Sequence, residues 1–199
     1  MRLVRRKNKR MTKMPWPVVP IKFCSHLAGK KPSEITTPML RRLSCGGMMH
    51  HCAARAVEAM IAAAKADGVI LKPTSSGDTF RSIEQQRAGF VARYQKAPLA
   101  GATTRTWNGE KWYLKPGNAP LAAPNDDPKT CSRHMLGIAI DIANTGNKKV
   151  MDWLLANEQR FGFSHEVVEM PGAEPWHIRF TEGQAMPQAV LDYEAAKPA

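Results

Sequence analysis

The chain has 199 residues, 43% of them hydrophobic, and a formal net charge of +12. This length and composition predict one globular domain with an extension. No apolar run approaches the roughly 20 residues of a membrane-spanning helix, which excludes a membrane-spanning protein. Four cysteines at scattered spacings in a chain of this size exclude a disulfide scaffold.

The positive charge lies almost entirely at the N-terminus. Residues 1–44 hold 12 Lys or Arg and one acid, Glu34, a net charge of +11, whereas residues 45–199 hold 17 basic and 16 acidic residues, a net charge of +1. We therefore expect a basic arm over 1–46, with its boundary at Gly46-Gly47, and a near-neutral domain over 47–199. Prolines at 15, 17 and 20 favour an extended arm and argue against a cleaved secretory signal.

Hydrophobic periodicity and turn residues predict the elements of the first half. They are a short helix over 36–43 with Thr37 as N-cap, an Ala-rich helix over 48–67 that stops at Gly68, a strand over 69–71, and a helix over 82–95.

In the second half of the chain, the same signals predict a mixture of strands, helices and loops. They are a hairpin over 104–115 with a type I′ turn at Asn108-Gly109, a loop over 116–129, a strand over 138–143, a helix over 150–157, a strand from 161 to about 168, a turn over 169–173, a strand over 176–180 and a helix over 186–195.

Two stretches, Ser132–Asp141 and Glu174–His177, contain the residues typical of a catalytic zinc site. Such a site takes three protein ligands and keeps a fourth position for water, and His134, Asp141 and His177 could be those three. On adjacent strands Asp141 and His177 could point to one place, and Glu174 would then be the base. Either stretch alone is more typical of a histidine and a carboxylate that pair on the surface or in the core. The two stretches together favour a metal site.

These stretches resemble a known family. Ser-x-His-x-x-Gly-x-Ala-x-Asp at 132–141, Glu-x-Trp-His at 174–177 and the box at 76–86 are similar to the motifs of the D-alanyl-D-alanine carboxypeptidase and L-alanyl-D-glutamate endopeptidase metallopeptidases. The resemblance runs from about Gly47 to the C-terminus. It implies zinc enzymes that act on peptidoglycan stem peptides. Two positions depart from the pattern, Phe80 where Tyr is common and Cys131 in place of a Pro-Gly pair.

The resemblance also implies roles for individual residues. His134, Asp141 and His177 would bind Zn2+, Glu174 would be the catalytic base, and Arg81 would hold the scissile carbonyl or its oxyanion. Ser132 and Gln86 would support the substrate or the metal ligands, and Trp176 would contact substrate.

Two other groups of possible ligands are not expected to bind metal. Cys45, His50, His51 and Cys52 match no closed four-ligand pattern, so helix packing and surface imidazoles are expected there. Cys131, three residues before His134, is expected to be a buried or pocket-wall thiol.

The fold class expected is therefore α+β, with a small antiparallel sheet that carries the zinc site, flanked by helices, after an extended basic arm.

An enzyme without a secretory signal that attacks the cell wall fits a phage protein. We expect a tail-associated wall-opening enzyme of the virion, whose residues 1–46 contact other tail proteins. A soluble endolysin, present in the host cytoplasm before lysis, and a non-catalytic virion protein are the alternatives. A nucleic-acid partner is not expected, because a binder has no need of a base beside a metal.

Overall fold

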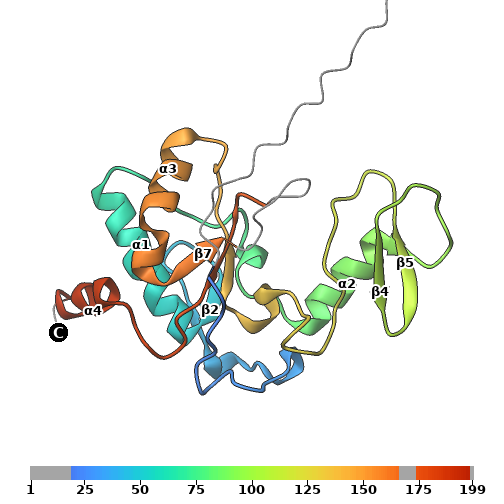
Figure 1. The fold of residues 1–199 in the computed structure, drawn as a ribbon, viewed down its shortest axis with the longest axis horizontal. Helices are drawn as coiled ribbons and strands as arrows, with labels where there is room; N and C mark the ends of the chain where they lie inside the picture. The colour runs from blue at the N-terminus through green and yellow to red at the C-terminus, as the bar shows by residue number, and fades with distance from the viewer. Residues whose placement is uncertain (1–18, 166–173, 198–199) are drawn as a thin grey trace, which may run out of the picture.

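The structure is a computed structural model, and it describes residues 19–165 and 174–197. Within them lie small antiparallel sheets and helices in an α+β arrangement, which confirms the predicted fold class (Figure 1). The α-helices are α1 (His51–Ala66), α2 (Ile83–Arg93), α3 (Lys148–Asn157) and α4 (Gln188–Ala195), and the short 3-10 helices are η1 (Pro32–Glu34), η2 (Thr37–Met39), η3 (Ser76–Asp78), η4 (Arg133–Leu136) and η5 (Glu158–Phe161). The strands are β1 (Leu40–Arg42), β2 (Met48–His50), β3 (Tyr94–Gln95), β4 (Thr104–Trp107), β5 (Glu110–Leu114), β6 (Ala139–Asp141), β7 (Phe163–His165) and β8 (His177–Phe180).

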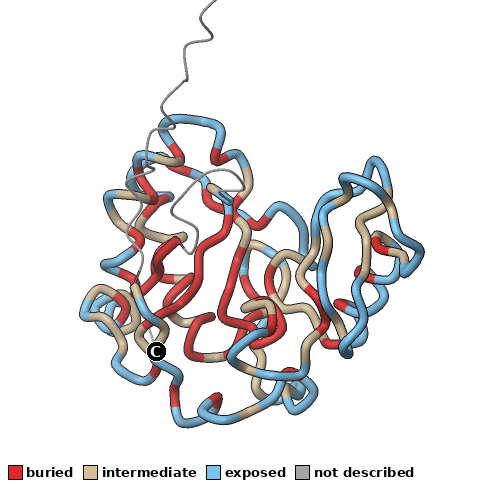
Figure 2. Tube along the Cα trace, turned by 45° about the vertical axis from the view of Figure 1, so that its right-hand side comes forward, coloured by how far each residue is buried: buried red, intermediate tan, exposed pale blue. Residues whose placement is uncertain are grey.

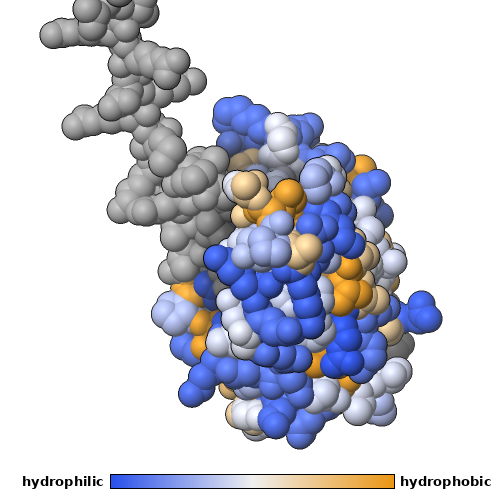
Figure 3. All heavy atoms as spheres, turned by 90° about the vertical axis from the view of Figure 1, so that its right-hand side faces the viewer, coloured by the Kyte–Doolittle hydropathy of each residue, from blue (hydrophilic) through white to orange (hydrophobic). Residues whose placement is uncertain are grey.

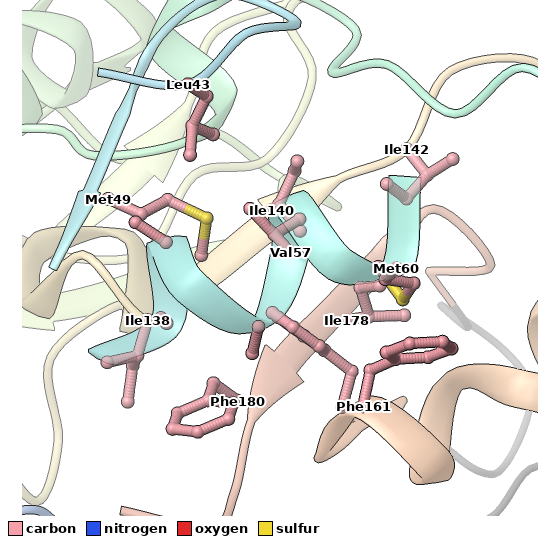
Figure 4. Close-up of a cluster of buried hydrophobic side chains, with 14 of the residues drawn as sticks. Leu43, Met49, Val57, Met60, Ile138, Ile140, Ile142, Phe161, Ile178 and Phe180 are labelled. Atoms are coloured by element: carbon pink, nitrogen blue, oxygen red, sulfur yellow. The ribbon is translucent and has the colours of Figure 1, made fainter. Parts of the chain in front are cut away.

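The central sheet has the order β6-β8-β7, and both pairings are antiparallel. One face of β6 and β8 carries apolar residues that are fully buried, among them Ile140 and Ile178. They pack beneath Val57 and Met60 of α1 (Figure 4). Because side chains alternate along a strand, Asp141 points away from this core. Burial of the apolar face therefore fixes where Asp141 points.

A second lobe holds α2 and the sheet β3-β5-β4. It has its own small core, in which Phe90 and Tyr94 stack and Trp107 and Trp112 pack on Phe90. The lobe stands beside the main body and is mostly exposed outside this core (Figures 1 and 2). Its outward face is largely hydrophilic, with scattered apolar residues (Figure 3). The predicted hairpin over 104–115 is confirmed, and positive φ angles at Asn108 and Gly109 suit its type I′ turn.

Residues 19–46 lie on the main body. Cys24, Leu27 and Leu43 are buried in the main core. The helix predicted over 36–43 is wrong: η2 ends at Met39, and Leu40–Arg42 instead pairs with β2 as a hairpin. Residues 1–18, which hold the most basic part of the predicted arm, lie outside the described residues. The division into 1–46 and 47–199 stays a prediction.

Three further predictions need correction. The helix predicted from 48 begins at His51, because 48–50 forms β2. No strand forms over 69–71, since no neighbouring strand pairs with these residues; Ile70 is instead largely exposed. The strand predicted from 176 begins at His177, so Trp176 does not share a face with Ile178 and Phe180.

The other predicted elements are present. Helices α2, α3 and α4, and strands β6 and β7, fall within or close to the expected ranges. The end of the strand predicted to 168 and the turn over 169–173 lie outside the described residues. In the described part of the chain, no helix is long and apolar enough to cross a membrane.

Candidate metal centre

The structure brings His134, Asp141 and His177 together. Their potential ligand atoms all lie within 4.8 Å of one another. His134 comes from η4, and Asp141 lies directly opposite His177 in the pairing of β6 with β8. Gly137, in the left-handed conformation at φ 66°, ends η4 and lets the chain turn into β6. Sheet register and this turn therefore place all three side chains at one point.

Hydrogen bonds orient the two imidazoles. His177 Nδ1 lies 2.8 Å from Asp141 Oδ1, and His134 Nε2 lies 3.2 Å from the same oxygen. On its other side, His134 Nδ1 lies 2.8 Å from the backbone oxygen of Thr79. A carbonyl can only accept, so Nδ1 of His134 carries the hydrogen and Nε2 presents its lone pair to the site. This is the tautomer that a metal ligand needs.

Asp141 is held in its charged form. Burial alone would raise the pKa of Asp141, but its close contacts with the imidazoles of His134 and His177 bring that pKa well below its usual range. A carboxylate that stays ionised beside two imidazoles is a donor set suited to a divalent cation. Two nitrogens and one carboxylate oxygen fit Zn2+, and the cluster opens on a cleft that leaves room for further ligands.

The cluster lies in a cleft of about 450 Å3 between the main body and the second lobe. The other predicted site residues that line it are Arg81, Ser132, Glu174 and Trp176. Glu174 and Trp176 are exposed to solvent in the turn before β8, and the amide of His177 donates to the carbonyl of Glu174 at 3.0 Å. One tight turn therefore links Glu174, the predicted base, to His177, a predicted metal ligand. Cys131 is a buried thiol in the cleft wall, as predicted, and burial raises its pKa to about 11.

Gln86 lies behind Arg81 and does not line the cleft. Its side chain is fully buried; its amide oxygen accepts from Arg81 Nη1 at 2.9 Å, and its amide nitrogen donates to Ala122 O at 2.7 Å. Asp78 Oδ1, 3.2 Å from Arg81 Nη2, holds the other side of the guanidinium. Arg81 is therefore fixed in direction before any substrate binds.

Two supporting groups were missed from the sequence. Thr79, whose carbonyl orients His134, acts through its backbone, which leaves no signal in residue type. His165 is the second such group, and no sequence pattern marks it. It is fully buried, with Nδ1 3.0 Å from Glu158 Oε1 and Nε2 3.1 Å from the carbonyl of Pro175, so it holds the turn that carries Glu174.

Fold and site together define a metallopeptidase-type centre, and comparison with known proteins places the chain more narrowly. The family model described as "VanY: D-alanyl-D-alanine carboxypeptidase" matches residues 47–183. The chain therefore belongs to the VanY family, a zinc-dependent class of peptidases that act on peptidoglycan. This confirms the family resemblance drawn from the three sequence boxes.

The similarity to solved structures is one of fold. The LdcB LD-carboxypeptidase is 21% identical, with a TM-score of 0.53, over 82% of this chain and 77% of that chain. VanYB in complex with D-alanine-D-alanine is 22% identical, with a TM-score of 0.47, over 84% and 93% of the two chains. A mutant of the D,D-pentapeptidase VanY in complex with Zn(II) is 23% identical, with a TM-score of 0.47, over 83% and 91%. Comparison with curated protein sequences found no match.

Proposed function

We propose that this enzyme removes the C-terminal D-alanine from peptidoglycan stem peptides, with Zn2+ held by His134, Asp141 and His177. The observation that carries the proposal is the convergence of these three side chains in one cleft with Glu174 and Arg81. Bound zinc would polarise the scissile carbonyl and lower the pKa of a water molecule. A structural site would be closed by four protein ligands, whereas this cluster opens on a cleft.

The protein side chains perform the proton transfers and orient the substrate. Glu174 takes a proton from the attacking water and returns it to the amine that leaves as the peptide bond breaks. Arg81 donates hydrogen bonds to the carbonyl oxygen, which gains negative charge during attack. Gln86 positions Arg81, and Ser132 and Trp176 contact the peptide at the cleft wall.

The charge of the cleft suits an anionic peptide. Arg93 of α2 and Arg105 of β4 line it together with Arg81, and neither Arg93 nor Arg105 forms an ion pair with a described carboxylate. A stem peptide that ends in D-alanine presents a free carboxylate one residue from the scissile bond, and guanidinium groups bind carboxylates with paired hydrogen bonds. The D-alanine-D-alanine bound in the VanYB structure supports this substrate.

An endopeptidase that cuts inside the stem is the second candidate, because the cleft continues past the metal cluster to Ala119–Ala122 and could hold a longer chain. Mass spectrometry of stem pentapeptides and cross-linked muropeptides, incubated with zinc-loaded protein, separates the two. Release of one terminal alanine supports the carboxypeptidase, whereas an internal cut establishes the endopeptidase. No product from either substrate, with zinc bound, would refute both.

Glu174→Gln tests the role of the base. We expect turnover to fall by about 100-fold or more while zinc content stays unchanged, because the amide cannot accept the proton. Glu110→Gln is the matched control, since Glu110 is an exposed carboxylate on β5 that pairs with Lys96. Full activity in Glu174→Gln would refute the assignment.

We further propose that the enzyme opens the cell wall as a component of a phage tail, with residues 1–46 as the contact to other tail proteins. The concentration of positive charge in residues 1–44 supports a role in binding an acidic protein surface. Mass spectrometry of purified virions tests this location. Presence in intact particles supports it, and occurrence only in the lysate would establish a soluble endolysin.

A further inference from the structure

A second cluster of metal-ligating side chains lies outside the cleft. Cys24, His26 and Cys52 have ligand atoms within 4.8 Å of one another, and His50, His51 and Cys52 form a second such group that shares Cys52. The rings of His26 and His51 meet edge to face, with centroids 4.6 Å apart. Only His50, His51 and Cys52 are neighbours in the sequence, because Cys24 and His26 lie on the segment before β1 and approach α1 only in the folded chain.

The two thiols and His50 are buried, and one polar atom of His50 has no hydrogen-bond partner among the described residues. Cys24 and Cys52 are 2% and 6% exposed. His50 is fully buried, and no described residue makes a hydrogen bond with its Nε2. A cavity of about 10 Å3 lies among Cys24, His50 and Cys52. Buried polar nitrogens almost always have a partner, and this Nε2 would gain one if a neighbouring thiol became a thiolate.

Hydrogen bonds assign different roles to the two adjacent histidines. His51 Nδ1 lies 3.3 Å from the carbonyl oxygen of Met39 and therefore carries the hydrogen, which leaves Nε2 free to bind a metal. His50 Nδ1 accepts from the amide of Cys52 at 3.4 Å as the N-cap of α1, so its Nε2 carries the hydrogen. His50 is thus a donor suited to a thiolate, and His51 is a ligand.

We propose that Cys24, His26, His51 and Cys52 bind one structural Zn2+, with His50 donating a hydrogen bond to a thiolate ligand. Two thiolates and two imidazoles are a common closed tetrahedral set for zinc. Tetrahedral zinc with nitrogen and sulfur ligands places ligand atoms roughly 3.3–3.8 Å apart. The two groups share Cys52, and the ring of His51 lies 4.6 Å from that of His26, so a movement of His51 toward Cys24 and His26 would complete the set.

The imidazoles of the cluster are in the form that binds metal, whereas the thiol of Cys52 must lose a proton to do so. Burial, together with the neighbouring Cys24, raises the pKa of Cys52 to about 12, so without metal this thiol keeps its proton at neutral pH. Burial and the adjacent imidazoles lower the pKa of His50 to about 4. The pKa of His51 is also lowered, chiefly by burial. Neutral imidazoles are the form that binds metal, and metal binding would release the thiol protons.

A metal here would tie residues 24–26 to the first turn of α1. It would stabilise the fold at the point where the N-terminal segment meets the main core, and it would leave the catalytic cleft open. The inference does not depend on the proposed peptidase activity, because it concerns different residues.

Cobalt substitution can distinguish the proposed structural site from the metal site in the catalytic cleft. The predicted catalytic ligands include no sulfur, and Cys131→Ser removes the one thiol that lines the described part of the cleft. A near-ultraviolet charge-transfer band from thiolate to Co2+ that persists in Cys131→Ser therefore reports on Cys24 and Cys52. Co2+ is titrated into reduced, metal-free, full-length protein under anaerobic conditions. We expect the band to reach its maximum within two equivalents, because the catalytic site also binds Co2+, and we expect added Zn2+ to remove it.

Variants locate the ligands. Cys24→Ser and Cys52→Ser should lose the band, and Cys45→Ser should keep it, since Cys45 lies outside the cluster. His26 is exposed, so His26→Ala can be made without disturbing the core. It should weaken cobalt binding by more than about 100-fold, because loss of an outer-shell partner alone costs roughly 10–100-fold. His51→Gln should change the visible cobalt spectrum.

Three results would overturn the proposal. The first is a wild-type protein without the charge-transfer band at saturating Co2+. The second is a band that persists in the folded Cys24→Ser and Cys52→Ser variants. The third is a disulfide between Cys24 and Cys52 in freshly purified protein, detected as a mass lower by two hydrogens and resistance to alkylation. Peptidase activity would be unaffected by the first result, so failure of this proposal is distinct from failure of the proposed function.

Discussion

Gly47 tests how the fold holds the imidazole of His134. Gly47 has a φ of +83°, and a Cβ placed there would lie 2.3 Å from Thr79 Oγ1 and 3.1 Å from the backbone oxygen of Ser76. The Thr79 hydroxyl accepts from the amide of Met48 at 3.1 Å and donates to the Ser76 carbonyl at 2.8 Å, and the Thr79 carbonyl accepts from His134. Gly47→Ala should therefore displace Thr79, which orients the proposed metal ligand His134.

Gly46 is the matched control in the same turn. It has a φ of +98°, and a Cβ placed there would have no atom of the described residues within 4 Å, so Gly46→Ala carries only the backbone cost of about 1–2 kcal/mol. Gly47→Ala adds the loss of the two Thr79 hydroxyl hydrogen bonds, about 1 kcal/mol each, for a total of about 3–4 kcal/mol. At roughly 2–4 °C per kcal/mol for a chain of this size, the melting temperature should fall by about 6–16 °C in Gly47→Ala and by about 2–8 °C in Gly46→Ala.

Thermal unfolding and zinc affinity provide the two measurements. Zinc binding at the cleft should weaken by about 10–100-fold in Gly47→Ala, the usual effect of losing an outer-shell partner. It should stay unchanged in Gly46→Ala. Equal melting temperatures and equal zinc affinities in the two variants would refute the role of Thr79.

Three further predictions follow from the site. Gln86→Leu removes a hydrogen bond to the charged Arg81, worth about 1.5–3 kcal/mol, so kcat/KM should fall by about 10-fold or more while zinc content is unchanged; an unchanged kcat/KM would contradict the positioning role. His165→Leu leaves the buried carboxylate of Glu158 without the imidazole and should lower the free energy of unfolding by about 3–5 kcal/mol. The double variant with Glu158→Leu should lose less stability in urea unfolding, but it should still lose activity, because the turn at Pro175 is no longer held by His165. Full activity in the double variant would exclude that role. The folded-state pKa of Asp141 is depressed, so its stabilising effect is present above its unfolded pKa of about 4 and is lost as the pH falls below that value. The stability difference between metal-free wild type and Asp141→Asn, from urea unfolding, should therefore shrink between about pH 5 and pH 2, and a difference independent of pH would refute the pairing.

The sequence was informative where side-chain chemistry and periodicity coincide. The alternation around Ile140, Asp141 and Ile142 predicted a carboxylate that points out of an apolar layer, and the structure places it so. Asn108-Gly109 predicted the hairpin, because few residue pairs adopt positive φ at two successive positions.

Other features depend on contacts distant in sequence. The residues over 36–43 suit a short helix locally, but pairing with β2 turns Leu40–Arg42 into a strand. The role of the Thr79 carbonyl, and the approach of Cys24 and His26 to Cys52, come from tertiary packing and have no local pattern. Gln86 was expected near the substrate or the metal ligands and lies behind Arg81, because its helix faces Ala122.

The most direct test of the central claim joins metal binding to hydrolysis at the cleft. Zinc is titrated into metal-free wild type and into His177→Ala while D-alanine release from a stem pentapeptide is followed by mass spectrometry. The wild type should recover turnover in proportion to the zinc bound by His134, Asp141 and His177. The His177→Ala variant should neither bind zinc at this site nor release D-alanine. Turnover that survives chelation in the wild type, or that is unchanged in His177→Ala, would contradict the assignment of this cleft as a zinc peptidase site.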